Sequence, residues 1–208
     1  MRHLQQPGKA LPLNVPRALP VRWHSADRWL ESSLPPFWRG WLTDSGSLTR
    51  KLIQASGNTF AVQVLRQGYG RPRPAEHRAL GLPSRQLALV REVVLHGAGT
   101  PWVYARSIIP LNTLSGRQRA LRKLDARPLG ALLFADRGMR RGPLQITQLR
   151  GALIPDHLAP PAALLWGRRS LFFLDGKPLL VSEIFLPDFD PAISPVPGAP
   201  LPGGLAAR

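Results

Sequence analysis

Cysteine is absent from all 208 residues of the sequence. This excludes a disulfide, a thiolate nucleophile and a zinc site with thiolate ligands. The five histidines are scattered without the spacing of metal ligands, so no metal site is expected. No apolar run reaches the roughly 18 residues that a transmembrane helix needs, and Met1–Pro20 lacks the apolar stretch of a secretory signal. We therefore expect a cytoplasmic protein that does not span a membrane.

Acidic residues are also few, because 12 aspartates and glutamates stand against 28 basic residues and the formal charge at pH 7 is +16. All but four of the basic residues are arginine. This charge fits either a solvated, arginine-rich surface or the attraction of an anionic partner or substrate. The arginines are spread along the whole chain, and no segment interleaves them with aromatic residues as an RNA-binding surface does. A nucleic-acid partner is therefore not favoured.

Proline and glycine, with 23 and 19 residues, are concentrated at the two ends of the chain and in one internal stretch. Such composition predicts that the compactly folded segment is shorter than the chain. We expect a flexible N-terminal arm over residues 1–25, one domain over residues 26–187, and a tail rich in proline and glycine over residues 188–208.

The periodicity of the central region predicts strands joined in antiparallel hairpins. The strongest pattern lies at Arg85–His96, where both alternating faces are largely apolar, as in a central strand. The dipeptide Asp175–Gly176 is the strongest short signal of a hairpin turn. Further strands are expected at residues 59–68, 102–110, 143–151 and 166–187, and short helices within residues 26–55 and 113–135. Strands in hairpins with helices between them predict a single α+β domain built on an antiparallel sheet.

Two charged residues occur on strand faces that are otherwise apolar. Arg91 alternates with Leu89 and Val93, and Glu183 alternates with Val181 and Phe185. An uncompensated charge in such a place costs several kcal/mol, so each needs a partner. The pattern leaves two alternatives open. The charges either form a core ion pair with each other or with other buried groups, or they line a closed pocket where Arg91 binds a carboxylate and Glu183 a hydroxyl.

Other polar residues give weaker signals. Arg168 and Arg169 are interpreted as the solvated end of a strand, and Lys177 as a turn residue. His96 has no serine or aspartate at the spacing of a catalytic triad. Residues 113–135 resemble a helix-turn-helix in geometry alone, because no base-reading helix is evident.

Six segments, taken in order, resemble chorismate pyruvate-lyases, a family in which chorismate is split into 4-hydroxybenzoate and pyruvate for ubiquinone synthesis. One such segment is weak evidence, whereas six in register are much stronger. The resemblance covers about residues 27–187. The segments are GSLTRKL (46–52), REVVLHGAGTPWVYARSIIP (91–110), TLSG (113–116), PLGALLF (128–134), WGRRS (166–170) and GKPLLVSEIFLP (176–187).

The resemblance implies an antiparallel sheet surrounded by helices, with helical flaps over an internal ligand site, and an enzyme that needs no cofactor. It also implies ligand-binding roles for Leu48, Arg91, Leu129 and Glu183, with Arg91 and Glu183 as the catalytic pair. Arg91 would hold the ring carboxylate and Glu183 the ring hydroxyl. One of Arg168, Arg169 and Arg106 would then meet the enolpyruvyl carboxylate. Because the pattern had already marked Arg91 and Glu183, the pocket becomes the preferred alternative.

The sequence departs from the family in two places. Leu48 replaces the methionine of better-known members, and the stretch of residues 135–165 is longer than usual. Two other functions compete with the lyase, namely a ligand-sensing domain of the same fold and a basic nucleic-acid-binding protein. Residues 1–45 are too short and too rich in proline for an ordinary DNA-binding domain, which disfavours a sensor attached to one. We expect a monomer that acts on a small-molecule substrate.

Overall fold

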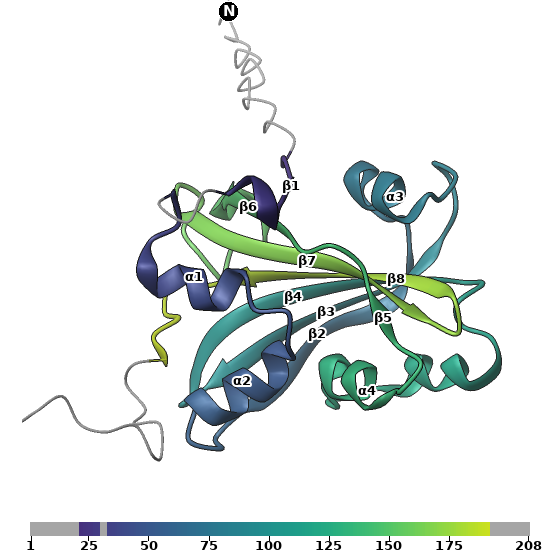
Figure 1. The fold of residues 1–208 in the computed structure, drawn as a ribbon, viewed down its shortest axis with the longest axis horizontal. Coiled ribbons are helices and arrows are strands. Elements are labelled where there is room, and N and C mark those ends of the chain that lie inside the picture. Colours follow the sequence, from purple (N-terminus) through teal and green to yellow (C-terminus); the bar gives the residue numbers. More distant parts are fainter. Residues whose placement is uncertain (1–20, 30–32, 192–208) are drawn as a thin grey trace, which may run out of the picture.

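A computed structural model gives the fold and describes residues 21–29 and 33–191 (Figure 1). Its main element is an eight-stranded sheet in which β1, β6, β7, β8, β4, β3 and β2 follow one another and β5 pairs with β7. Every pairing is antiparallel. The strands are β1 His24–Ser25, β2 Ala61–Gly70, β3 Ala88–Gly97, β4 Thr100–Pro110, β5 Arg140–Arg141, β6 Gln145–Arg150, β7 Leu164–Leu174 and β8 Lys177–Phe185.

Short helices cover both sides of this sheet. The α-helices are α1 Pro36–Leu42, α2 Leu48–Ala55, α3 Pro74–Leu80 and α4 Leu129–Ala135, and the 3-10 helices are η1 Ala26–Arg28, η3 Gly116–Lys123 and η4 Gly151–Leu153. Figure 1 shows α2 and α4 on one side of the sheet and α3 on the other. The predicted class, an α+β domain with an antiparallel sheet and surrounding helices, is confirmed.

The two predicted hairpins are confirmed. Strand β3 is central, paired with β2 and β4, and the turn to β4 passes through Ala98 and Gly99, both with positive φ. The turn from β7 to β8 has positive φ at Asp175 and Gly176, as a type I′ turn requires. At the end of the β3–β4 hairpin, a Cβ atom on Gly97 would lie 2.2 Å from the Trp102 ring, so this position has space only for glycine.

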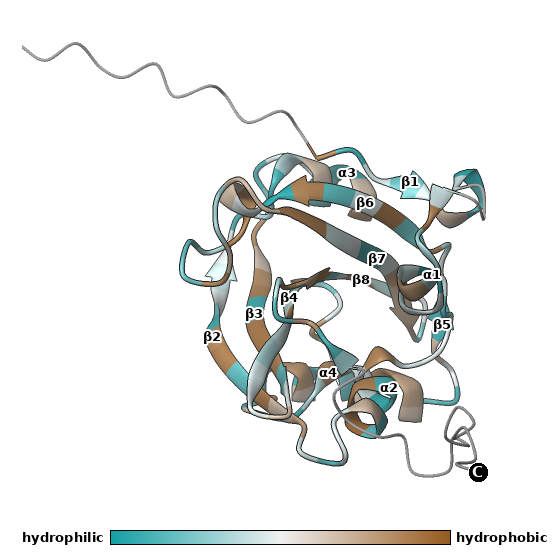
Figure 2. Ribbon diagram, turned by 90° about the vertical axis from the view of Figure 1, so that its left-hand side faces the viewer, coloured by the Kyte–Doolittle hydropathy of each residue, from teal (hydrophilic) through white to brown (hydrophobic). Residues whose placement is uncertain are grey.

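Alternation along the strands divides the core between the two sides of the curved sheet (Figure 2). On the first face, Val93 and Leu95 of β3 pack with Leu42 and Leu52 of the helices. The first face also holds a cluster in which Leu121, Leu129 and Leu133 pack on Leu89, Ile109 and Phe172. The second face holds two further clusters, one with Leu80, Ala88, Val90, Ile108 and Leu180, and one with Val94, Tyr104, Leu149, Ile154, Ala159, Leu165, Ile184 and Leu186. The long stretch of residues 135–165 therefore supplies β6 and part of the cover of the second face.

The strand predicted at Arg85–His96 is shorter in the structure, and the two helices within residues 113–135 begin without a side-chain cap. Leu87 is 44 % exposed, because β3 begins one residue later at Ala88. Ser115 precedes a 3-10 helix and makes no capping bond with its side chain. Pro128 occupies the N-cap of α4 and not its first turn.

The domain includes a few residues of the expected arm and tail. His24 and Ser25 pair with Ile146 and Gln145, and Phe189 is buried against Trp41 and Phe185. The rest of the expected arm and tail, residues 1–20 and 192–208, lies outside the described residues. Within the described ranges, no helix has the length and apolar character needed to cross a membrane.

Candidate functional site

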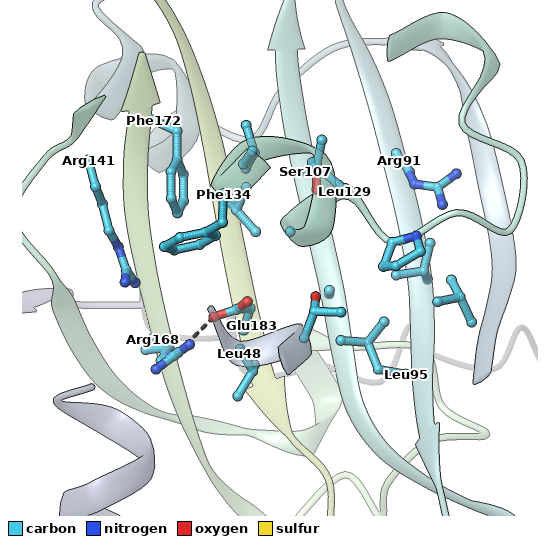
Figure 3. A pocket seen from close by; sticks show the side chains of 18 of the residues that line it. Leu48, Arg91, Leu95, Ser107, Leu129, Phe134, Arg141, Arg168, Phe172 and Glu183 are labelled. Atoms are coloured by element: carbon cyan, nitrogen blue, oxygen red, sulfur yellow. Dashed lines mark hydrogen bonds and ion pairs between the residues drawn. The ribbon is translucent and has the colours of Figure 1, made fainter. Parts of the chain in front are cut away.

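A pocket lies between the first face of the sheet and the helices α2 and α4 (Figure 3). Its cavity is small, about 40 Å³. A water molecule needs roughly 10–15 Å³ of such space, so the closed pocket has room for a few waters and not for an aromatic ring. Its walls are largely apolar, and its polar side chains are Thr49, Arg91, Ser107, Arg141, Arg168 and Glu183.

Arg91 stands on β3 at one end of the pocket and is 2 % exposed. Its Nη1 donates to Gln67 Oε1 at 2.7 Å, and its Nη2 donates to the carbonyl oxygens of Asp125 at 2.7 Å and Arg127 at 3.2 Å. Burial lowers the pKa of Arg91, and the charge of Asp125 opposes that shift. No carboxylate lies within 4.0 Å of the guanidinium among the described residues. Arg91 is thus a buried cation held by neutral acceptors.

Glu183 stands on β8 and does not pair with Arg91. Its Oε2 accepts a hydrogen bond of 2.7 Å from Nε of Arg168, the residue directly opposite on β7. Arg168 is 1 % exposed, and its Nη1 also donates to the carbonyl oxygens of Trp41 and Asp44. The prediction that Arg168 lies at a solvated strand end is therefore wrong. It sits inside β7, where a guanidinium can stay charged because a carboxylate and two carbonyls accept from it.

Arg141 of β5 is a pocket residue that the sequence analysis missed. Its Nε donates to Ser170 Oγ at 3.0 Å, and its Nη1 donates to the carbonyl oxygens of Ser45 and Gly46 in the loop before α2. Burial lowers the pKa of Arg141 and the charge of Arg168 lowers it further, while Glu183 opposes these effects. No signal in the sequence distinguishes it, because β5 has two residues and shows no alternation.

The two helices contribute the apolar residues Leu48 and Leu129, both buried at the pocket. Ser47 caps α2 by accepting a bond of 3.3 Å from the backbone N–H of Arg50, which fixes the start of the helix beside the cavity. Leu129 is the first residue of α4. The helices meet closely there, since a Cβ at Gly130 would lie 2.5 Å from Thr49 Oγ1. The four residues that the resemblance named thus all line one pocket.

Arg106 and Arg169 project from the second face and do not line this pocket. Arg106 donates to Glu76 at 2.7 Å and to Glu92 at 2.6 Å, and Tyr104 donates to Glu92 at 2.7 Å. Burial by itself lowers the pKa of Arg106, but the two carboxylates outweigh it and raise the pKa. Arg169 is 8 % exposed, so its predicted place at a solvated strand end is wrong too. Of the three arginines considered for a second carboxylate, the structure brings Arg168 to the pocket.

The remaining polar candidates lie elsewhere. His96 Nε2 and Gln63 Oε1 are 3.0 Å apart at the hairpin end. Lys177 follows the Asp175–Gly176 turn, as expected, and donates to Ser115 Oγ at 2.9 Å. No cluster of three or more histidine, aspartate and glutamate side chains suited to a metal ion occurs in residues 21–29 and 33–191.

Comparison with known proteins gives a consistent family match. A family model described as "Chorismate lyase" matches residues 19–192. The "Probable chorismate pyruvate-lyase" of Aromatoleum aromaticum is 43 % identical over 178 residues, which cover 80 % of this chain and 95 % of that protein. Proteins with the same description from Marinobacter nauticus and Pseudomonas aeruginosa are 48 % and 40 % identical, covering 72 % and 79 % of this chain and 76 % and 90 % of theirs.

Solved structures show a similar fold at low sequence identity. The effector domain of PhnF from Mycobacterium smegmatis aligns with a TM-score of 0.53 at 17 % identity, covering 69 % of this chain and 90 % of that domain. PhnF of the same organism aligns with a TM-score of 0.54 at 16 % identity, covering 70 % of this chain and 66 % of that one. At this identity the likeness concerns the fold alone.

Proposed function

Because the chain belongs to the chorismate lyase family, we propose that it is a chorismate pyruvate-lyase, which converts chorismate into 4-hydroxybenzoate and pyruvate. One observation of the structure carries this proposal. The pocket has a buried guanidinium, Arg91, at one end and the Glu183–Arg168 pair with Arg141 at the other (Figure 3). Chorismate has a ring carboxylate at one end and a hydroxyl beside the enolpyruvyl ether at the other, so the two charge patterns match.

Arg91 is the proposed anchor of the ring carboxylate. A guanidinium has five N–H groups, and the described bonds of Arg91 use three of them. The remaining two, on Nε and Nη1, donate to no described residue, and we propose that the carboxylate accepts from these groups. Arginine suits this role because its charge persists at any ordinary pH.

Glu183 is the proposed partner of the ring hydroxyl. Arg168 occupies Oε2, and Oε1 accepts from no other described residue. The sheet register places Glu183 opposite Ala105 and Arg91 opposite Ser107, with β4 between β3 and β8. Two strand spacings amount to roughly 10 Å. This separation of the strands would let the two side chains contact opposite ends of a six-membered ring once the cover has moved.

The enolpyruvyl carboxylate would lie toward β7, beside Arg168 and Arg141. The enolpyruvyl ether is on the ring carbon next to the one that carries the hydroxyl, so it falls on the Glu183 side of the ring. Both arginines reach this part of the pocket, and both also donate to backbone carbonyls at the end of α1 and in the loop before α2. A substrate with two carboxylates would therefore contact a cation at each end.

The reaction is an elimination. The ring carbon with the hydroxyl loses its hydrogen as a proton, the bond from the neighbouring carbon to the enolpyruvyl oxygen breaks, and the electron pair completes the aromatic ring. The departing enolpyruvate takes a proton on its methylene carbon and becomes pyruvate, so no atom or electron is gained or lost. Glu183 would accept the ring proton, and Arg168 would hold that carboxylate in place. Aromatisation supplies much of the driving force, so the protein chiefly orients the substrate in a dry site.

Entry of the substrate requires movement of the cover. The closed cavity of about 40 Å³ cannot hold the ring, and α2 and α4 lie over it. These two short helices would act as the flaps that the resemblance implies. Their closure would exclude water, which strengthens the charge interactions inside the pocket.

The test incubates the purified protein with chorismate, without added metal or cofactor, and measures 4-hydroxybenzoate and pyruvate together. We expect equal amounts of both products. Arg91→Ala should lower kcat/KM by about 100-fold or more, because it removes a buried charge-assisted contact. Arg66→Ala is the matched control, since Arg66 lies on the neighbouring strand β2 and is exposed, and it should stay within about twofold of wild type.

Two results would contradict the proposal at different points. Unchanged turnover in Arg91→Ala would show that Arg91 does not anchor the ring carboxylate. No product above the spontaneous rate, together with saturable binding of an aromatic acid, would indicate a ligand sensor of the same fold. The expected cytoplasmic location, the monomeric state and the lack of a nucleic-acid partner stay predictions.

A further inference from the structure

A second hollow lies on the other face of the sheet, separate from the pocket of Arg91 and Glu183. Its volume is about 470 Å³, within the range of roughly 300–1,000 Å³ of small-molecule sites. It is bounded by α3, by strands β4, β6, β7 and β8, and by residues 152–154. We call it the second-face hollow. The sheet separates it from the catalytic pocket, because neighbouring residues such as Arg168 and Arg169 point to opposite faces.

Arg169 is the unusual residue of the second-face hollow. It is 8 % exposed, its Nε donates to Gln145 Oε1 at 2.7 Å, and its guanidinium lies 4.6 Å from the centre of the Trp23 ring. Its two terminal nitrogens donate to no residue in the described ranges, and no carboxylate there lies within 4.0 Å. These two nitrogens face the hollow, where a ligand can accept hydrogen bonds from them.

Glu76, the carboxylate near Arg169, is already paired with Arg106, which also pairs with Glu92. Glu76 accepts from Arg106 at 2.7 and 3.1 Å, and Glu92 accepts at 2.6 Å. Two exposed arginines, Arg73 and Arg78, also line the hollow, so positive charge exceeds negative charge around it. Burial lowers the pKa of Arg169 to about 10, with Glu76 opposing and Arg78 adding to the shift. The guanidinium is therefore charged at neutral pH, and Glu76, the carboxylate that also lines the hollow, is paired with Arg106 and makes no ion pair with Arg169.

The floor of the second-face hollow is apolar. Leu149 of β6, Ile154 after η4 and Ile184 of β8 line it, and all three are buried. The ring of Trp23 also lines the hollow, and the guanidinium of Arg169 lies over it. A small inorganic anion would pair with Arg169 but would leave the apolar floor exposed to water. A ligand with a charged head and an apolar body would pair with Arg169 and cover the floor.

We propose that the second-face hollow binds an amphipathic organic carboxylate. The terminal nitrogens of Arg169 hold the two carboxylate oxygens, Arg78 adds attraction at the rim, and the apolar body lies over Leu149, Ile154 and Ile184. The planar fork of arginine matches a carboxylate in this bidentate manner. This site is distinct from the chorismate site and does not depend on the proposed function.

The test measures binding of 2-naphthoate to the full chain by its fluorescence and by calorimetry. Because the pocket of Arg91 also takes an aromatic carboxylate in the proposed function, the measurement is made in the Arg91→Ala background. There we expect saturable binding that the second change Arg169→Gln weakens about 10-fold or more. The neutral analogue 2-naphthol should bind much more weakly than 2-naphthoate. Arg78→Gln alters an exposed residue and should weaken binding about threefold, so it decides the matter if Arg169→Gln fails to fold.

Three results would overturn the proposal. The first is no saturable binding of 2-naphthoate at millimolar concentration. The second is binding that Arg91→Ala abolishes and the Arg169 and Arg78 variants leave unchanged, which would place the probe in the catalytic pocket. The third is equal binding of 2-naphthol, which would remove the role of the carboxylate. Since none of these readouts uses turnover of chorismate, failure here and failure of the lyase proposal are distinguishable.

Discussion

At the scale of single residues, the two oxygens of Glu183 have different surroundings. Oε2 accepts from Arg168 at 2.7 Å, while Oε1 has no other partner among the described residues. The side chain keeps 17 % of its surface exposed, although Arg168 beside it is 1 % exposed. Glu183 therefore combines a fixed orientation with one oxygen that no other described residue occupies.

Replacing Glu183 with glutamine separates charge from hydrogen bonding. Glu183→Gln retains an acceptor for the substrate hydroxyl and loses the base, so we expect kcat to fall about 100-fold or more while KM changes less. Steady-state kinetics with chorismate measure both quantities. Asp156→Asn, at an exposed site, makes the same chemical change and should have wild-type kinetics. Wild-type kcat in Glu183→Gln would remove any role of this residue in proton transfer.

The sequence predicted some of these residues and missed others for a physical reason. Arg91 and Glu183 stand in long strands where alternation makes a charge conspicuous. Arg168 adjoins Arg169 and a glycine, so the sequence did not show which arginine lines the pocket. Arg141 belongs to a strand of two residues. Its place is set by pairing with Phe172 on β7, a contact between residues far apart in the chain.

At the scale of elements, the cover of the pocket depends on the contact between α2 and α4. Gly130 approaches Thr49 so closely that a Cβ there would lie 2.5 Å from Oγ1 and 3.4 Å from Cβ of Thr49. Both helices have fewer than nine residues and gain little stability from their own backbone bonds. Their position must come from packing on the sheet and on each other.

A methyl group at this contact should loosen the cover. Gly130→Ala would push α4 away from α2, and we expect KM for chorismate and the dissociation rate of 4-hydroxybenzoate to rise about three- to tenfold. Thr49→Ala in the same chain removes the nearest atom and should restore part of the loss. Stopped-flow binding measures the dissociation rate. Wild-type values in Gly130→Ala would show that this contact does not control closure.

At the scale of the whole molecule, a buried charge cluster joins helix and sheet on the second face. Glu76 of α3, Glu92 of β3 and Arg106 of β4 form two ion pairs of 2.7 and 2.6 Å. Burial by itself raises the pKa of Glu92, but bonds from Tyr104 and Arg106 outweigh it and hold the pKa below its ordinary value of 4.5. The cluster therefore stabilises the fold when Glu92 is ionised.

The lowered pKa of Glu92 predicts that part of the stability is lost in acid. Its contribution to the free energy of unfolding is complete above the unfolded value of 4.5 and disappears as the pH falls through the lowered folded value. Glu92→Gln should cost about 1–3 kcal/mol at neutral pH, and its difference from wild type should shrink on acidification. Urea unfolding between neutral pH and about pH 3 measures both curves. Curves that stay parallel would contradict this assignment.

The sequence by itself determined the antiparallel hairpins, the α+β class, the family and the two charges that belong to apolar strand faces. These features follow from local periodicity and turn chemistry, which neighbouring residues carry. The tertiary structure decided that Glu183 pairs with Arg168 and not with Arg91, that Arg141 enters the pocket, and that Arg169 faces a second hollow. Such features depend on strand order and on which face each short strand presents, and these arise from contacts between segments distant in sequence.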